Sequence, residues 1–536
     1  MDIRNKTAAE SSTERQEAGV PGSGSNSRKT LFFRIIVFLL SLLGFGAFAP
    51  LGLDFHHDGV MFIPALRVAA GETVFRDVFC QYGLLSPLIQ GLAVKIGGGE
   101  LLAMKYCSVL FYAGIAVMLD MVWARLLTLK WRSLLLVMFW GLMPDTMVTF
   151  HAWSSIFALF FSLVSLWLLL KYFDEKRWYF PVLSGIAAGL TFLSRHPVGV
   201  VTAVALLAGM FFEAMLTLPV KMRLKAMMKN AGSLLAGLTA VLFGAALYLI
   251  CNGAWDDFVL QCWSYVGKFV HNRSAGGNWG YFAESLFPFF TDAGLLDSIF
   301  AFLPMAALVW LAIGVRRAAR GEQVRENLFI CVLSVFSLGA WHQYYPVPCV
   351  RHLFWAGIPF FGFWILSLRE LFSGSQPRKL LCRSVAVLMI LVCIVAISVR
   401  VNSGILRLSE LPRRRSVEIA GLKGMKLTRG EYSMINHIYS LYDSLPEHIK
   451  KRGVVNYTAD GLWSVILPES GFRHPQFLWM GGGGLYPDYE SRIVEHIKKY
   501  RPAVLYSKPL WLENYVPLIS WQYMGENHTF ACPLEL

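Results

Sequence analysis

The amino-acid sequence predicts an α-helical polytopic membrane protein with about eleven transmembrane helices and a small C-terminal α/β domain outside the membrane. The 536 residues are 55% hydrophobic and only 16% charged, with a mean hydropathy of +0.50. The apolar residues form runs near the ~20 residues that cross a bilayer core. Short Lys and Arg clusters separate these runs, so the net charge of +14 indicates membrane topology and not nucleic-acid binding.

The basic clusters assign a side of the membrane to each end of the apolar runs. Residues 1–30 are rich in Ser, Gly and charge and are predicted to form a disordered cytoplasmic tail. Arg28, Lys29 and Arg34 hold the start of the first run inside, so the chain emerges outside near residue 54. Two apolar runs separate each basic cluster from the next, at 125–132, 171–177, 221–229, 316–325 and 369–383. All the clusters are therefore cytoplasmic, with the N-terminus inside and the C-terminus outside.

The apolar runs themselves give the expected spans. They lie near 31–53, 103–124, 133–144, 150–170, 179–194, 197–217, 231–251, 297–315, 328–341, 352–368 and 384–400. The runs at 133–144 and 328–341 are short, so we expect them to tilt, to be buried in the bundle or to extend into their flanks. A cleavable signal peptide is not expected, because a long polar tail precedes the first run and many spans follow it.

Three segments are predicted outside the membrane domain of residues 31–400: the loops 54–100 and 252–296, and residues 401–536. The last segment alternates "GVVNYTAD" and "PAVLYSKP" with polar, helix-like stretches such as "YESRIVEHIKKY". This alternation is typical of a small α/β domain. Loop 252–296 is rich in aromatic residues, which suits either a lid over a lipid-linked headgroup or an amphipathic segment on the bilayer.

The first outside loop concentrates acidic residues at the membrane boundary. It begins "LDFHHDGVMFIPALRVAAGETVFRDVFCQYGLLSP" and carries Asp54, Asp58 and Asp77. Residues 58–70 mix apolar and polar side chains irregularly, which predicts a short helix on the membrane surface, and "GLLSPLIQGLAVKIGG" predicts a second. Carboxylates at such a boundary serve as general bases, as metal ligands or as solvated surface charge.

Three stretches of this loop carry a resemblance to a known superfamily. They are "HHDG" at 56–59, "AAGETVFRDVF" at 69–79 and "YGLLSPL" at 82–88. Their order resembles the first loop of the GT-C glycosyltransferases, which include the protein O-mannosyltransferases, the lipid A aminoarabinose transferases and bacterial relatives that use polyprenyl-phosphate sugars. The plan of about eleven spans with an outside C-terminal domain is similar too. Members often carry two adjacent acidic residues where this chain has His-Asp-Gly, which leaves the register between Asp54 and Asp58 open.

The resemblance implies an inverting glycosyltransferase at the outer face of a bacterial inner membrane. A carboxylate would accept the proton of an acceptor hydroxyl while that hydroxyl displaces polyprenyl phosphate from the sugar. The spacing from Gly71 favours Asp58 as this base, with Asp54 and Asp77 as the other candidates. The acceptor would be a lipid-linked or envelope glycan, a lipid A-like molecule or a protein, and the need for a divalent metal is left open.

A leaving phosphate calls for cations on the same face. "LSRHPVG" places Arg195 in one outer turn, and "WHQYYPVPCVRHLFW" places four further candidates in another: His342, Tyr345, Arg351 and His352. Arginine presents a forked donor that matches a phosphate, so Arg195 and Arg351 come first, although either could equally anchor at lipid headgroups.

Supporting roles near the acceptor are assigned to Arg76, His57 and Asp145, and His151 is a weaker candidate beside Asp145. Asp58 and Asp77 could instead pair with Arg67 and Arg76 as ordinary loop residues. The histidines are not expected to bind metal, because no HxH or HxxxH spacing is present.

Two other functional classes remain open. A transporter or flippase of lipid-linked sugars would share the spans and outer cations, but should show internal repeats and charges near the bilayer midplane, which the sequence lacks. A non-catalytic envelope assembly subunit would explain the outside domain alone. The nine cysteines show no CxxC, and although Cys251 and Cys262 could pair in an oxidising compartment, no disulfide framework is expected.

Overall fold

The computed structural model describes residues 25–264, 267, 299–344, 350–373, 379–458, 460–471, 489–507, 518–521 and 528–533. Three predicted features lie outside these residues: the tail up to residue 24, most of the loop 252–296, and Tyr345.

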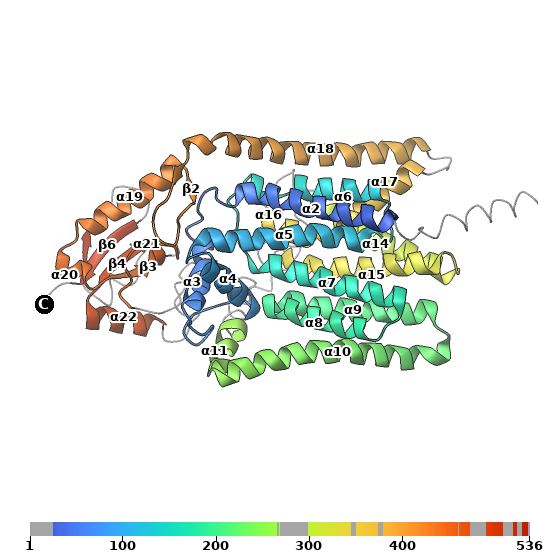
Figure 1. Cartoon of the computed structure of the whole chain (residues 1–536), viewed down its shortest axis with the longest axis horizontal. Coiled ribbons are helices and arrows are strands. Elements are labelled where there is room, and N and C mark those ends of the chain that lie inside the picture. Colours follow the sequence, from blue (N-terminus) through green and yellow to red (C-terminus); the bar gives the residue numbers. More distant parts are fainter. Residues whose placement is uncertain are drawn as a thin grey trace, which may run out of the picture.

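Long antiparallel helices form a bundle (Figure 1). Eight of the helices described are long and apolar enough to cross a bilayer, by length and composition alone. They are α2 (Ser25–Phe48), α5 (Leu101–Trp123), α7 (Ser154–Glu175), α9 (His196–Thr217), α10 (Val220–Cys251), α14 (Ile299–Ala319), α15 (Val324–Ala340) and α18 (Lys379–Ser409). The predicted class of a helical integral membrane protein is confirmed.

Three other predicted spans coincide with shorter helices. The run at 133–144 lies on α6 (Leu129–Gly141), and the run at 179–194 is α8 (Tyr179–Ser194). The run at 352–368 is divided among α16 (Val350–Gly357), η6 (Ile358–Phe360) and α17 (Phe361–Ser373). At ~1.5 Å per residue α6 is shorter than a bilayer core, so the number of eleven spans stays a prediction.

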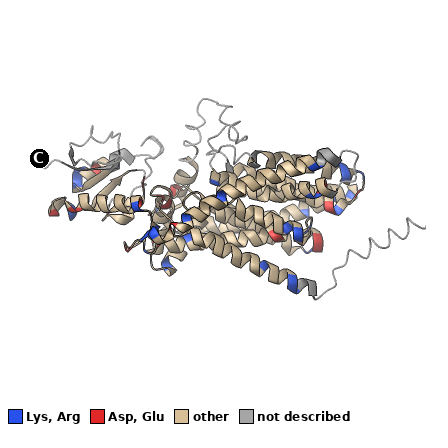
Figure 2. Ribbon diagram, turned by 90° about the horizontal axis from the view of Figure 1, so that it is seen from above, with Lys and Arg blue, Asp and Glu red and all other residues tan. Residues whose placement is uncertain are grey.

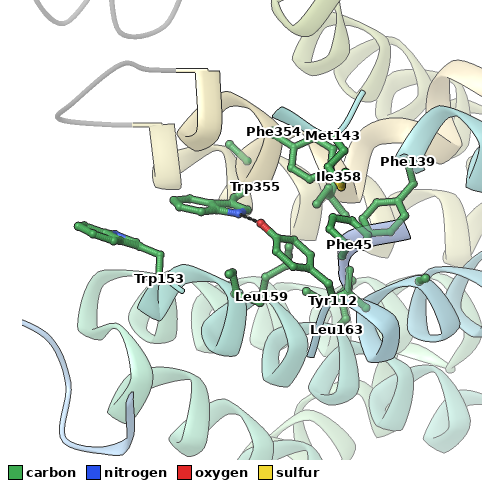
Figure 3. Close-up of a cluster of buried hydrophobic side chains, with 14 of the residues drawn as sticks. Phe45, Tyr112, Phe139, Met143, Trp153, Leu159, Leu163, Phe354, Trp355 and Ile358 are labelled. Atoms are coloured by element: carbon green, nitrogen blue, oxygen red, sulfur yellow. Dashed lines mark hydrogen bonds between the residues drawn. The ribbon is translucent and has the colours of Figure 1, made fainter. Parts of the chain in front are cut away.

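An aromatic cluster joins four helices of the bundle (Figure 3). The Phe45 ring of α2 stacks on Tyr112 of α5, with the ring centroids 4.3 Å apart. Trp355 of α16 donates its Nε1–H to the Tyr112 hydroxyl over 2.6 Å, and Phe139 of α6 packs against Phe45. Since a buried indole N–H needs a partner, this bond satisfies it and fixes α16 against α5.

Helix α3 (His57–Ala69) and helix α4 (Leu85–Ile96) lie at one end of the bundle, which we call the α3 end (Figure 1). Helix α3 was predicted to lie on the membrane surface, but most of its first half is buried. Residues 461–463 cover it, because Leu462 N donates to Phe55 O over 3.1 Å and Trp463 stacks on Phe55. A Cβ on Gly59 would lie 2.5 Å from Leu462 N, so only glycine permits this approach.

The C-terminal residues form strands and helices beyond the α3 end (Figure 1). Helix α18 runs unbroken past residue 401, so the predicted domain boundary falls inside a helix. After η7 (Leu411–Arg413) come β1 (Arg415–Ser416), β2 (Lys426–Leu427), α19 (Arg429–Asp443), α20 (Glu447–Lys450), β3 (Val454–Tyr457), α21 (Trp463–Ile466), α22 (Tyr489–Tyr500), β4 (Ala503–Ser507), β5 (Leu518–Trp521) and β6 (His528–Pro533). The sheet has the order β3-β4-β6-β5, with β3 and β4 parallel and the other pairs antiparallel.

Charged side chains gather toward the two ends of the bundle, and its middle is largely uncharged (Figure 2). The end away from α3, which we call the opposite end, carries ion pairs between neighbouring helices. Asp120 of α5 contacts Arg34 of α2 and Arg132 of α6, and Asp174 of α7 contacts Arg125.

Candidate functional site

Asp54, His57 and His151 converge at the α3 end, and we call them the Asp54 cluster. Asp54 Oδ2 lies 3.0 Å from His57 Nδ1 and 3.0 Å from His151 Nε2. Asp54 Oδ1 also accepts the backbone N–H of His57 over 2.8 Å, so this carboxylate fixes the start of α3. The three residues each offer one metal-ligand atom, and within the part of the chain described these atoms lie within 4.8 Å of one another.

The α6–α7 loop brings His151 to the cluster. His57 stacks on His151 with ring centroids 4.8 Å apart, and Trp153 packs against His57 at 5.5 Å. Tyr82 meets Trp153 edge to face. A Cβ on Gly83 would lie 2.0 Å from Leu193 O, so the Tyr-Gly pair lets this loop pack on the end of α8.

The charges of the cluster suit a divalent cation. Burial raises the pKa of Asp54, but the hydrogen bonds from His151 and His57 outweigh it and hold that pKa well below its usual range. Burial lowers the pKa of His151 to about 3, against the opposing effect of Asp54. At neutral pH the carboxylate is therefore ionised and the imidazole of His151 neutral. A metal ion would take the place of the protons by which His57 Nδ1 and His151 Nε2 contact Asp54. A nitrogen and oxygen donor set of this kind fits a first-row divalent ion such as Mn²⁺ or Zn²⁺.

Asp58, the favoured base in the sequence analysis, is buried in an ion pair. Its exposed fraction is 1%, and Lys105 Nζ of α5 lies 2.9 Å from its Oδ2. The same oxygen accepts the backbone N–H of Asp54 over 3.1 Å. Burial raises the pKa of Asp58 and Lys105 opposes that rise. Because the side chain of Asp54 is 27% exposed, a ligand reaches Asp54 more easily than Asp58, and Asp58 is placed to support the Asp54 loop.

Asp77 and Arg76 belong to a separate turn. Asp77 Oδ2 accepts the backbone N–H of Thr73 over 2.9 Å and pairs with Arg76 at 2.8 Å. Arg76 also donates to Asn252 O at the end of α10. The loop-residue alternative, in which Asp77 pairs with Arg76, is the arrangement found, whereas the pairing of Asp58 with Arg67 is not, since Arg67 contacts Glu469.

Arg351, on α16, contacts the α6–α7 loop, which also carries His151 of the Asp54 cluster. It donates to Thr149 O over 2.8 Å, and its buried Nε has no partner among the described residues. Burial raises the pKa of Asp145 to about 6, against the neighbouring charges of Arg351, Arg407 and Lys105. The positive charge of Arg351 thus acts on Asp145, but no ion pair joins the two side chains within the described residues.

The other predicted cations lie on neighbouring elements. Arg195, between α8 and α9, donates to Ser155 at the start of α7. His342 is exposed on η5 (Trp341–Tyr344), and the ring of His352 packs against Trp355 at 5.4 Å.

Several residues that hold the site were missed by the sequence analysis, Lys105 among them. Glu431 Oε1 accepts the backbone N–H of Leu53, directly before Asp54, over 2.9 Å. Lys426 pairs with the same loop, since its carbonyl accepts Gly52 N over 2.9 Å and its N–H binds Pro50 O. Arg407 of α18 donates to the carbonyls of Asp145 and Leu51. These contacts join distant segments, and no local sequence signal marks them.

No family model matches this chain, and no curated protein matches it in sequence.

Proposed function

We propose that this protein is an inverting membrane glycosyltransferase of the GT-C type. It would move a sugar from a polyprenyl-phosphate donor to a lipid-linked or cell-envelope acceptor at the periplasmic face of a bacterial inner membrane. The observation that carries the proposal is the Asp54 cluster with Arg351 beside it, at the end of a bundle of membrane-spanning helices. The resemblance of the first loop to GT-C enzymes and the predicted plan of eleven spans support the same assignment.

Asp54, His57 and His151 would hold the divalent cation. When bound, such an ion supplies Lewis-acid stabilisation of negative charge on the donor phosphate. Arg351 stands beside this position with a forked donor for the same phosphate.

Asp54 would receive the proton of the acceptor hydroxyl at Oδ1, because Oδ2 is the oxygen that faces the two imidazoles and the cation. The hydroxyl oxygen forms a bond to the anomeric carbon, and the bond from that carbon to the phosphate oxygen breaks. Because its lowered pKa makes Asp54 a weak base, most of the acceleration comes from orientation and from stabilisation of the leaving phosphate.

The test is sugar transfer by the purified protein in lipid, with a panel of radiolabelled polyprenyl-phosphate sugars and native-membrane extract as acceptor. We expect one donor to be consumed, a loss of about 10²- to 10⁴-fold in Asp54→Asn, and loss of transfer after chelation with recovery on adding Mn²⁺ or Zn²⁺. Asp77→Asn is the matched control, because it removes the same charge from the same loop outside the Asp54 cluster.

Equal losses in the two variants would remove the assignment of Asp54. Consumption of no donor by a folded wild-type preparation would contradict the enzyme and favour the transporter or assembly-subunit alternative.

A further inference from the structure

Cys80 and Cys262 lie together at the α3 end, although 182 positions separate them in the sequence. Both thiols reach the carbonyl oxygen of Tyr82, Cys80 Sγ at 3.6 Å and Cys262 Sγ at 3.3 Å. Cys262 Sγ also lies 3.7 Å from Cys80 O. Both side chains are buried, in one apolar cluster with Phe75 and Phe258.

The two segments that carry these cysteines are held in register. Gln261 accepts the backbone N–H of Cys80 over 2.9 Å and donates to Phe75 O over 2.8 Å. The Phe75 ring meets Phe258 edge to face at 5.2 Å. The backbone of Cys80 is thus tied directly to the side chain of the residue that precedes Cys262, so the two cysteines are held as neighbours.

We propose that Cys80 and Cys262 form a disulfide in the folded protein. This rests on the topology in the proposed function, which places the α3 end in an oxidising extracytoplasmic compartment. From the sequence, Cys251 was the candidate partner of Cys262. All three thiols are free in the structure, and Cys251 is exposed at the end of α10 whereas Cys262 is buried beside Cys80.

The oxidant is a disulfide-bearing thiol oxidant, such as a periplasmic oxidoreductase or oxidised glutathione. One protein thiolate attacks a sulfur of the oxidant, forms a mixed disulfide and releases one oxidant thiol. The second protein thiolate attacks the protein sulfur of that mixed disulfide and releases the second oxidant thiol. Two protons and two electrons pass to the oxidant, and the Cys80–Cys262 bond forms. Both cysteines are buried in one apolar cluster, so the closed bond would be shielded from attacking thiolates.

The consequence is a covalent link between the first outside loop and the segment after α10. The turn with Arg76 and Asp77 is already tied to Asn252 by a hydrogen bond. Phe75 in this turn adopts φ of 73°, a conformation that costs a non-glycine residue free energy and must be held by its surroundings. The disulfide would supply a permanent hold on that turn.

The test is peptide mass spectrometry on the full chain, with thiols blocked by an alkylating agent before cell lysis and no reductant. We expect a linked pair of peptides, two hydrogens lighter than the sum of the two, that contains Cys80 and Cys262, while Cys251 is alkylated. Cys251→Ser should leave the link intact, and Cys80→Ser should leave Cys262 free.

A second arm tests whether the two cysteines can pair at all, independently of the compartment. In it the purified protein is reduced and then exposed to oxidised glutathione. Re-formation of the same link supports the pairing. Alkylation of both cysteines in cells, or glutathione adducts without closure in the second arm, would overturn the proposal. A third outcome is that both thiols are free in cells but form the link when the purified protein meets oxidised glutathione. That outcome would also overturn the proposal, and it would place the α3 end in a reducing compartment. The link is measured independently of sugar transfer, so a linked protein that consumes no donor counts against the proposed function alone.

Discussion

The two ends of the helical bundle bury charged side chains in different ways. At the opposite end, three carboxylates are matched by cations from other segments of the chain: Asp120 contacts Arg34 and Arg132, Asp174 contacts Arg125 and Arg325, and Glu213 contacts Lys176. At the α3 end Asp58 pairs with Lys105, but Asp58 Oδ1, Asp145 Oδ2 and Arg351 Nε are among the buried atoms that have no partner within the described residues.

This difference indicates that the charges of the opposite end hold helices together, whereas some charges of the α3 end are placed for a ligand. The opposite end also leaves Arg132 Nε and Glu213 Oε2 without a partner in the described part of the chain, so the contrast lies in the pairing of charges and not in every atom. Buried polar atoms that lack a partner are costly, and they persist where a ligand completes them. Asp145 and Arg351 therefore mark the α3 end as the place where a ligand would complete buried charges, beside the Asp54 cluster.

The largest effect is expected at Asp58. Asp58→Asn leaves Lys105 buried without its counter-charge and should lower the free energy of unfolding by about 3–5 kcal/mol, measured by thermal or denaturant unfolding in detergent. The control is the double variant with Lys105→Met, which removes both charges and should recover most of the stability. A stable double variant that transfers sugar excludes Asp58 as the base, whereas a stable but inactive one restores Asp58 to that role.

A comparable but purely structural effect is expected at the opposite end. Asp120→Asn removes the acceptor shared by Arg34 and Arg132 and should lower stability by about 3 kcal/mol. Transfer per folded molecule should be unchanged, which is measured as activity normalised to the folded fraction. A loss of that normalised activity without a loss of stability would contradict the division between the two ends.

Features that depend on local pattern were predicted well from the sequence. The hydropathy runs and basic clusters gave the membrane class, and the irregular stretch at 58–70 gave the helix found at His57–Ala69. The number of spans remains a prediction, because runs such as 133–144 form helices too short to be counted by length.

The site depended on contacts that no local pattern contains. His151 lies 97 positions from Asp54, and Glu431 lies 378 positions from Leu53. Asp54 and Asp58 are four residues apart, yet only the packing of residues 461–463 and of Lys105 over α3 shows which one is buried. The histidines have no metal-binding spacing in the sequence, and yet the fold brings His57 and His151 to the carboxylate of Asp54.

A smaller effect is expected at Arg351. Arg351→Lys keeps the positive charge but loses the forked geometry, so transfer should fall by about 10- to 100-fold, mainly as a higher KM for the donor. Arg195→Lys is the matched control, because Arg195 is the other predicted arginine and contacts Ser155 away from Asp145. Unchanged transfer in Arg351→Lys would show that Arg351 has only a structural role through its contact with Thr149. A larger loss in Arg195→Lys would assign phosphate binding to Arg195 instead.

The smallest effect tests whether the C-terminal residues position the Asp54 loop. Glu431→Gln weakens the bond to Leu53 N by about 1 kcal/mol, and transfer and Mn²⁺ affinity should fall by about fivefold. Thr428→Ala is the control, since it removes the side chain that accepts Glu431 N at the start of α19 and leaves the bond to Leu53. Equal losses of Mn²⁺ affinity in both variants would assign the effect to helix capping. A loss confined to Glu431→Gln would show that a residue far along the chain sets the position of Asp54, and that the α3 end is completed by the C-terminal residues as well as by its own helices.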